Sequence, residues 1–257
     1  KQTLISQSKF DRSFGKHGIS AVAGFSQEWY TEKNFTAKRI NLTTEYNPSL
    51  VFGAQEGMSN SASAATWAIR SGFGRVNYSF DQRYLLEANL RYDLTSRFHK
   101  SNRAGLFPSF SAGWRVSEEA FFSSMHNVIN NLKIRASYGI LGNQYVGSSD
   151  YPYMAVVGAV AVPNIGTGAN VGYTQTTLPN PALHWETINM TNIGLDMTIG
   201  RKLTLTADWF LKNTEDILLR LTYPGVLGMS PTEENIGSVQ NKGWEVRSEE
   251  HTSELQS

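Results

Sequence analysis

The chain has 257 residues, of which 18% are charged and 12% aromatic, with a formal net charge of +1 and no cysteine. The absence of cysteine excludes disulfide frameworks, cysteine-ligated metal centres and a cysteine nucleophile. The charge balance gives no basic tract of the kind that binds nucleic acid, and no run of about 18 apolar residues is present to form a transmembrane helix.

Apolar and polar residues alternate with a period of two along most of the chain. Between residues 84 and 92 the even positions are apolar or aromatic, whereas the odd positions include Glu87, Asn89 and Arg91. Such alternation is typical of a strand with one apolar and one polar face. A helical period is weaker everywhere, and its best candidate is the segment 117–130. In chain order, the pattern predicts about nine strands, at residues 1–10, 17–30, 66–80, 83–97, 106–117, 131–143, 184–199, 202–217 and 236–246.

The lengths of these strands and of their connections are both informative. Several strands run to about 12–15 residues, whereas an average strand has roughly 5–6 and a membrane-crossing strand needs roughly 9–11. The connections alternate between short ones, such as 81–82 and 200–201, and long ones, such as 31–65 and 144–183. Alternate connections lie at opposite ends of an antiparallel sheet, so one end has tight turns and the other extended loops, as in outer-membrane barrels.

Two architectures fit this alternation. In a soluble β-sandwich, here a binding module, the apolar face is the core, whereas in a membrane barrel it meets lipid and the polar face lines the lumen. The long strands, the alternating loop lengths and the aromatic residues near strand ends, such as Tyr84, Trp114 and Trp185, favour the barrel. We therefore predict an all-β fold, an antiparallel transmembrane β-barrel, with the soluble β-sandwich binding module as the alternative.

Six ordered segments resemble one family of membrane proteins. The most specific is RYLLEANLRYD at 83–93 with SRF at 96–98, which is similar to the family pattern RYLLxAxxRxDGSSRF except that Leu94 and Thr95 replace Gly and Ser. The family is SusC/RagA, the TonB-dependent outer-membrane transporters of Bacteroidetes. The other five matching segments are 107–115, 132–139 with 142–144, 180–186, 192–196, and 235–237 with 241–245.

The resemblance implies a partial barrel, with about nine of roughly 22 strands present. It implies a parent protein that imports a nutrient, an oligosaccharide or a peptide, across the outer membrane of a Gram-negative cell. The implied partners are outer-membrane lipids, TonB acting through an N-terminal region outside this chain, a SusD-like lipoprotein and the solute, but no nucleic acid. The resemblance implies no enzymatic activity and no cofactor.

Charged residues on the polar phase are the first candidate site. Both signs are interspersed along neighbouring strands, so the residues could form a cross-strand ladder that stiffens the wall and seats a plug, or could contact the solute directly. The predicted lumen-facing wall consists of Arg75, Glu87, Arg91, Asp93, Arg135, Asp196 and Asp208.

The long loop 144–183 is the second candidate site. It carries Tyr145, Tyr151 and Tyr153 among Gly, Asn and Ser residues, and aromatic rings can stack on the apolar faces of sugars or peptides. We expect these three residues as substrate contacts, with packing against a partner or loop mobility as the alternatives.

No catalytic, cofactor-binding or metal-binding pattern is present in the sequence. The histidines lie far apart, and the adjacent acidic pairs 118–119 and 233–234 are expected in turns, where their side chains diverge. Residues 247–257 resemble the translated sequence of a short-read sequencing adapter. We therefore place the partial barrel domain at 1–246 and expect 247–257 to lie outside the fold.

Overall fold

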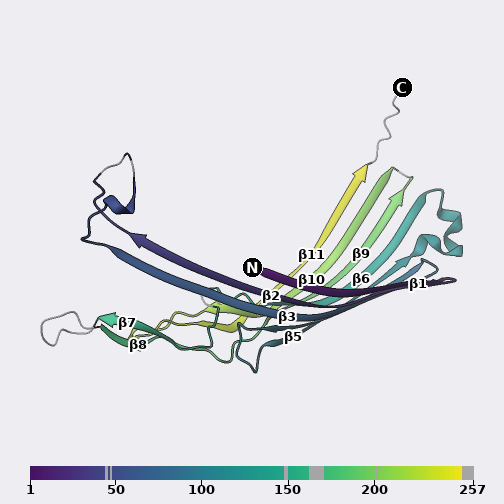
Figure 1. Ribbon diagram of the computed structural model, residues 1–257. Helices are drawn as coiled ribbons and strands as arrows, with labels where there is room; N and C mark the ends of the chain where they lie inside the picture. The colour runs from purple at the N-terminus through teal and green to yellow at the C-terminus, as the bar shows by residue number, and fades with distance from the viewer. Residues whose placement is uncertain (44–45, 47, 148–149, 162–170, 201, 251–257) are drawn as a thin grey trace.

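The computed structural model describes residues 1–43, 46, 48–147, 150–161, 171–200 and 202–250. Nine of its strands form one antiparallel sheet in the order β1-β2-β3-β4-β5-β6-β9-β10-β11, and Figure 1 shows this sheet as a single curved layer. The predicted all-β antiparallel fold is therefore confirmed. The strands of the sheet are β1 (Gln2–Phe14), β2 (His17–Lys38), β3 (Ser59–Phe80), β4 (Tyr84–Thr95), β5 (Ala104–Arg115), β6 (Ile129–Asn143), β9 (Glu186–Ile199), β10 (Leu203–Arg220) and β11 (Glu233–Glu250).

A second, two-stranded sheet lies within the long connection between β6 and β9. It pairs β7 (Val156–Ala161) with β8 (Val171–Thr177) and lies at the same end of the molecule as the extended ends of β2 and β3 in Figure 1. This hairpin was not predicted, because the segment has no long alternating run. Its attachment includes a bridge from Thr177 to Ser230 in the β10–β11 connection.

The segment 117–130, the best candidate for a helical period, forms no α-helix. The segment forms two short 3-10 helices, η2 (Val116–Glu118) and η3 (Ala120–Met125). Glu119 lies between them with extended backbone angles, φ −81 and ψ 145, so the first helix ends before the second begins. Two further 3-10 turns, η1 (Leu50–Phe52) and η4 (Gly225–Leu227), lie in long connections.

Three tight turns, after β1, β3 and β9, lie at one end of the sheet, and the longest connections lie at the other. The connection between β5 and β6 is the exception, because it lies at the end with the tight turns but contains residues 116–128. We call these two ends the short-turn end and the long-loop end. In the β3–β4 turn, Asp81 and Gln82 have φ 51 and φ 53, the left-handed angles that a tight hairpin turn matching the strand twist requires. The long-loop end receives the connections after β2, β4, β6 and β10.

The register between strands aligns residues of the same polarity into rows. One polar row runs Asn77, Glu87, Ser111, Ser137 and Asn192 across five neighbouring strands. Because side chains alternate between faces along each strand, this alignment places all polar phases on one surface, which we call the polar face.

The opposite surface is apolar and is not covered by a second layer in the part of the chain that the structure describes. Val76, Ala88, Phe110 and Tyr138 form one of its rows. Val76 is 49% exposed and Phe110 is 55% exposed, although both are large apolar side chains. A contiguous exposed apolar surface of this kind marks a membrane or protein contact, and the β-sandwich alternative, which would bury it, is not supported.

The aromatic residues expected near strand ends do not share one environment. Tyr84 and Trp114 pair across β4 and β5 on the apolar face, with their rings stacked at a centroid distance of 6.5 Å. Trp185 instead is only 6% exposed and belongs to a buried cluster. Its position just before β9 suggested an aromatic residue at the membrane–water interface. Its burial depends on how the connections fold over it, which the sequence pattern does not show.

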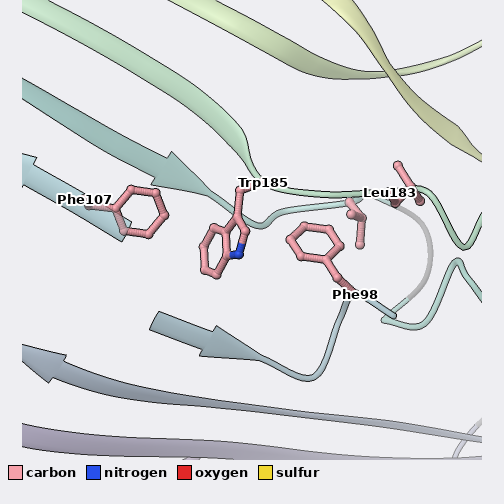
Figure 2. Close-up of a cluster of buried hydrophobic side chains, with 5 residues drawn as sticks. Phe98, Phe107, Leu183 and Trp185 are labelled. Atoms are coloured by element: carbon pink, nitrogen blue, oxygen red, sulfur yellow. The ribbon is translucent and has the colours of Figure 1, made fainter. Parts of the chain in front are cut away.

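That cluster is the buried apolar core of the long-loop end. The cluster consists of Phe98, Phe107, Val146, Leu183 and Trp185. Figure 2 shows Trp185 between Phe107 and Phe98, and the ring centroids lie 5.2 Å and 5.7 Å from that of Trp185 in edge-on arrangements. The cluster thus joins the β4–β5 connection, the start of β9 and the long β6–β9 connection.

Side-chain amides hold the same connections together. Asn102 Nδ2 donates to the carbonyl oxygens of Pro181, Ala182 and Leu183 at 3.3, 3.0 and 3.1 Å. Asn235 Nδ2 donates to the carbonyl oxygens of His184 and Asp216 at 3.0 and 2.9 Å. Two of the segments that carried the family resemblance, 180–186 and 235–237, therefore fix the geometry of the long loops.

Strand β11 continues past Val246, the predicted boundary of the barrel domain. Thr206 pairs with Arg247 and Leu203 pairs with Glu250. Residues 251–257 lie outside the described residues, and the expectation that 247–257 is an adapter sequence stays a prediction.

Replacing Trp185 with alanine is expected to loosen the long-loop end. Truncating a buried Trp costs about 3–5 kcal/mol, because the apolar contacts are lost and a cavity remains. In the full-length protein, amide hydrogen exchange should accelerate in 96–103 and 180–185. Val226→Ala is the matched control, since Val226 is 93% exposed in the β10–β11 connection. Unchanged exchange in the Trp185 variant would show that the cluster does not hold the loops.

Candidate functional site

The charged residues predicted to line the lumen all lie on the polar face, but they do not form one site. The strand register separates them into three side-chain networks, each with its own hydrogen bonds. The first contains Arg135, Asp196 and Asp208, the second contains Arg91 and Asp93, and the third contains Arg75 and Glu87.

The Arg135 network spans three strands. From β6, Arg135 Nη2 donates to Asp208 Oδ2 on β10 at 2.6 Å, and its Nε donates to Asp196 Oδ2 on β9 at 3.2 Å. Its Nη1 donates to Asn192 Oδ1 at 3.3 Å. Gly194 lies beneath the guanidinium, and a Cβ at that position would collide with it. The glycine therefore creates the space in which one arginine bridges β6, β9 and β10.

The Arg91 network lies nearer the long-loop end. Arg91 Nε donates to both carboxylate oxygens of Asp93 at 2.8 and 2.9 Å, and its Nη2 donates to Ser71 Oγ at 2.9 Å. Asp93 is 5% exposed and Ser71 is 1% exposed. Such buried polar groups are stable only when their hydrogen bonds are made, and here Arg91 of β4 donates to both, to Asp93 on its own strand and to Ser71 on β3.

The third network is a relay of hydrogen bonds between β3 and β4. Arg75 Nε donates to Asn89 Oδ1 at 2.7 Å, and Asn89 Nδ2 donates to Glu87 Oε1 at 2.7 Å. Glu87 and Arg135 also line a groove of about 670 Å³ along the polar face, together with Asp11 and Lys133. Because each wall charge already has a protein partner, this arrangement favours the cross-strand ladder over direct solute contact.

The loop tyrosines divide into two places. Tyr151 and Tyr153 lie together, with ring centroids 6.1 Å apart and nearly perpendicular, and Tyr153 also meets the His99 ring at 5.8 Å. Tyr145 lies apart and is 66% exposed. The role of the three tyrosines as substrate contacts stays a prediction. Of the three, only Tyr151 and Tyr153 lie close enough together to offer one shared surface.

One cluster near these tyrosines was missed by the sequence analysis. Tyr30 stacks on Trp67 across β2 and β3 at a centroid distance of 5.7 Å, and Arg97 Cζ lies 5.1 Å from the centroid of the Trp67 ring. Arg97 Nη2 also pairs with Asp150 Oδ1 at 2.9 Å. Arg97 stood in a segment that carried the family resemblance, but nothing in the sequence pointed to its partner on a distant loop.

At the short-turn end, Glu119 joins an aromatic pair to a turn. Its carboxylate accepts hydrogen bonds from Tyr84 Oη at 2.6 Å, Trp114 Nε1 at 3.1 Å and Arg83 Nη1 at 3.4 Å. These donors, the Tyr84 hydroxyl first, hold the pKa of Glu119 below its ordinary value. Asp81 in the adjacent turn pairs with Lys16 at 3.0 Å, and this hydrogen bond lowers the pKa of Asp81.

Among the residues that the structure describes, no group of three or more His, Asp or Glu side chains is placed to hold a metal ion. Among the same residues, no helix is both long enough and apolar enough to cross a membrane.

Residues 2–255 match a family model described as TonB dependent receptor-like, beta-barrel. A curated relative, the TonB-dependent receptor P39 of Formosa agariphila, is 34% identical over 251 residues, which cover 92% of this chain and 22% of that protein. The TonB-dependent receptor SusC of Bacteroides thetaiotaomicron is 37% identical over 182 residues, which cover 68% of this chain and 18% of that protein. The chain thus spans about a fifth of the length of these relatives.

A solved structure has the same fold. The structure of the RagAB peptide transporter superposes with a TM-score of 0.85 at 24% sequence identity, over 99% of this chain and 28% of that one.

Replacing Arg135 with methionine is expected to weaken the wall. Asp196 and Asp208 would then face each other without their shared cation, but the Arg135 side chain is 32% exposed and solvent screens part of the effect. We expect a loss of about 1–2 kcal/mol, measured as the urea midpoint of the full-length protein in lipid vesicles. Lys133→Met, on the same strand and face, is the control. Equal midpoints for the two variants would contradict the bridging role.

Acid should weaken the short-turn end through Glu119. Its pKa in the folded protein is below the ordinary value of 4.5, so its contribution to stability is complete at neutral pH and is lost as pH falls through the folded pKa. Between about pH 7 and pH 3, the melting temperature of Glu119→Gln should therefore fall less than that of the unsubstituted protein. Glu118→Gln is the matched control, and a parallel fall in all three proteins would rule out this role.

Proposed function

Because this chain belongs to the TonB dependent receptor-like β-barrel family, whose members are outer-membrane proteins of Gram-negative bacteria, we propose that the whole protein imports a nutrient solute across the outer membrane. Membership confirms the predicted resemblance to SusC/RagA, the outer-membrane location and the prediction that the protein is not an enzyme. Import is supported by the likeness in fold to the RagAB peptide transporter.

One observation supports this function most directly. The sheet has an exposed apolar face and a continuous polar face, and the register aligns both across nine strands. In a membrane, an apolar outer surface meets lipid while polar groups face a water-filled interior through which a solute can pass. The long-loop end then faces the cell exterior, and the short-turn end faces the periplasm.

The partners belong to the proposal as well. We expect energy from TonB, acting through an N-terminal region outside this chain, and a SusD-like lipoprotein that covers the long-loop end. The solute is an oligosaccharide or a peptide. Tyr151 and Tyr153, which share one surface at the long-loop end, are the proposed contacts for its apolar faces. Tyr145 is proposed as a further contact, from a separate exposed position.

Deleting the gene for the whole protein tests the proposal. The deletion strain should lose growth on one member of a panel of oligosaccharides and peptide digests supplied as sole carbon source, and growth on glucose should be unchanged. Complementation with the full-length gene should restore growth, and complementation in a strain without TonB should not. Unimpaired growth of the deletion strain on every member of the panel would contradict import as the function.

A further inference from the structure

Arg97 is an unusually enclosed cation at the long-loop end. It is only 9% exposed, and it lies two residues after the end of β4, next to Phe98 of the buried cluster. The backbone that leads into Arg97 is fixed, because Arg97 N donates to Thr95 Oγ1 at 3.1 Å and Ser96 N donates to the carbonyl oxygen of Ala68 at 2.9 Å. The side chain therefore projects from a rigid part of the wall.

The guanidinium of Arg97 is only partly satisfied. Its Nη2 pairs with Asp150 Oδ1 at 2.9 Å, whereas its Nε is buried and has no hydrogen-bond partner among the residues that the structure describes. The Nε and Nη2 atoms form one edge of a guanidinium, whose two parallel N–H groups match the two oxygens of a single carboxylate. Asp150 thus occupies one half of a two-pronged site and leaves a buried donor unpaired, which is unfavourable.

The surroundings of this edge suit a solute. Trp67, whose ring lies 5.1 Å from Arg97 Cζ, belongs to the same phase of β3 as Ser71 and therefore lies on the polar face. The pairing of β3 with β4 ends at Ile69 and Thr95, so the edge of β3 beyond this pair has no strand beside it. The loop segment with Asp150 lies along this unpaired edge of β3, where Tyr151 Oη lies 3.4 Å from Thr66 Oγ1.

We propose that Arg97 binds a carboxylate of the solute, which displaces Asp150 from the guanidinium. This inference rests on the proposed import function and names the chemical class of its solute. A bidentate carboxylate would satisfy both Nε and Nη2, while Trp67 and the stacked Tyr30 would contact the apolar part of the solute next to it. Asp150 is the internal group that holds the site in the absence of solute.

The exchange has a consequence for the loop. Asp150 precedes Tyr151 and Tyr153, and its bond to Arg97 ties this segment to the end of β4. When a solute carboxylate takes its place, the tie is broken and the segment is free to move. Solute binding at Arg97 and release of the tyrosine-bearing loop are then a single event.

The test uses the full-length protein in detergent, with calorimetry on two acidic probes, trigalacturonate and triglutamate. These probes separate a uronic acid source of the carboxylate from a peptide source. Maltotriose and triglutamine are the neutral counterparts. The variants are Arg97→Gln, Arg97→Lys, which keeps the charge but loses the two-pronged edge, and Asp150→Asn. Lys100→Gln removes one charge from the same connection and is the matched control, since Lys100 is exposed.

We expect at least one acidic probe to bind more tightly than its neutral counterpart. Arg97→Gln and Arg97→Lys should weaken that binding by about tenfold or more, because charge-assisted hydrogen bonds are lost. Asp150→Asn should strengthen it, because the internal competitor is gone, and Lys100→Gln should leave it unchanged. Amide exchange of 150–155 should accelerate when the probe is added to the unsubstituted protein.

A purely structural Arg97–Asp150 pair gives different results. In that case Asp150→Asn does not strengthen binding, and the probe does not accelerate exchange in the loop. The proposal would also be overturned if the Asp150→Asn variant bound neither acidic probe, or if both Arg97 variants bound the probe as tightly as the unsubstituted protein. The growth defect of the deletion strain is measured independently, so the import function can hold even if Arg97 does not bind a carboxylate.

Discussion

The backbone of a membrane-spanning chain must satisfy its own hydrogen bonds, because the hydrocarbon layer offers no other partner. Here the antiparallel ladders supply them between neighbouring strands, whereas the outer edges of β1 and β11 have no partner strand among the described residues. The register is unbroken along the whole of β2 and β3 and along most of β6 and β9. Since a shift by one residue would move every side chain to the opposite face, this ladder also decides which residues meet lipid. The polar networks, the apolar surface and the separation of short turns from long loops all depend on it.

The ladder of strand hydrogen bonds does not hold the long loops in place. Segments that carry the family resemblance do so. Trp185 and Phe98 form the centre of the buried cluster, while Asn102 and Asn235 hydrogen-bond the carbonyls of neighbouring connections. A wall of strands exposes most of its side chains to lipid or lumen, so its largest buried cluster lies at this end, and a smaller buried group with Val116 and Phe122 lies in the β5–β6 connection at the short-turn end. Three of the segments that carry the family resemblance, 96–98, 180–186 and 235–237, therefore shape the long-loop end, whereas the others lie within the strands of the wall.

Period-two alternation predicted the sheet and its polar face, because a strand's two environments are recorded directly in its residue order. It predicted strand ends less well: β2 extends to Lys38 and β3 begins at Ser59, where Phe35 is the only large apolar residue to mark the alternation. Such extensions project beyond an apolar layer and lose the alternation. The β7–β8 hairpin and the ion pair of Arg97 with Asp150 were not predictable for a related reason. They depend on contacts between distant connections, which no local period records.

Spin-label accessibility in the full-length protein, reconstituted in lipid, tests the central claim most directly. Nitroxides placed singly along β4 and β6, at 86–90 and 134–138, would be probed with oxygen, which concentrates in lipid, and with a water-soluble nickel chelate. The account predicts alternation, with oxygen favoured at Leu86, Ala88, Ile134 and Ala136 and nickel favoured at Glu87, Asn89, Arg135 and Ser137. Equal accessibility along each strand, or the reverse phase, would contradict a sheet with one face in lipid and the other in water.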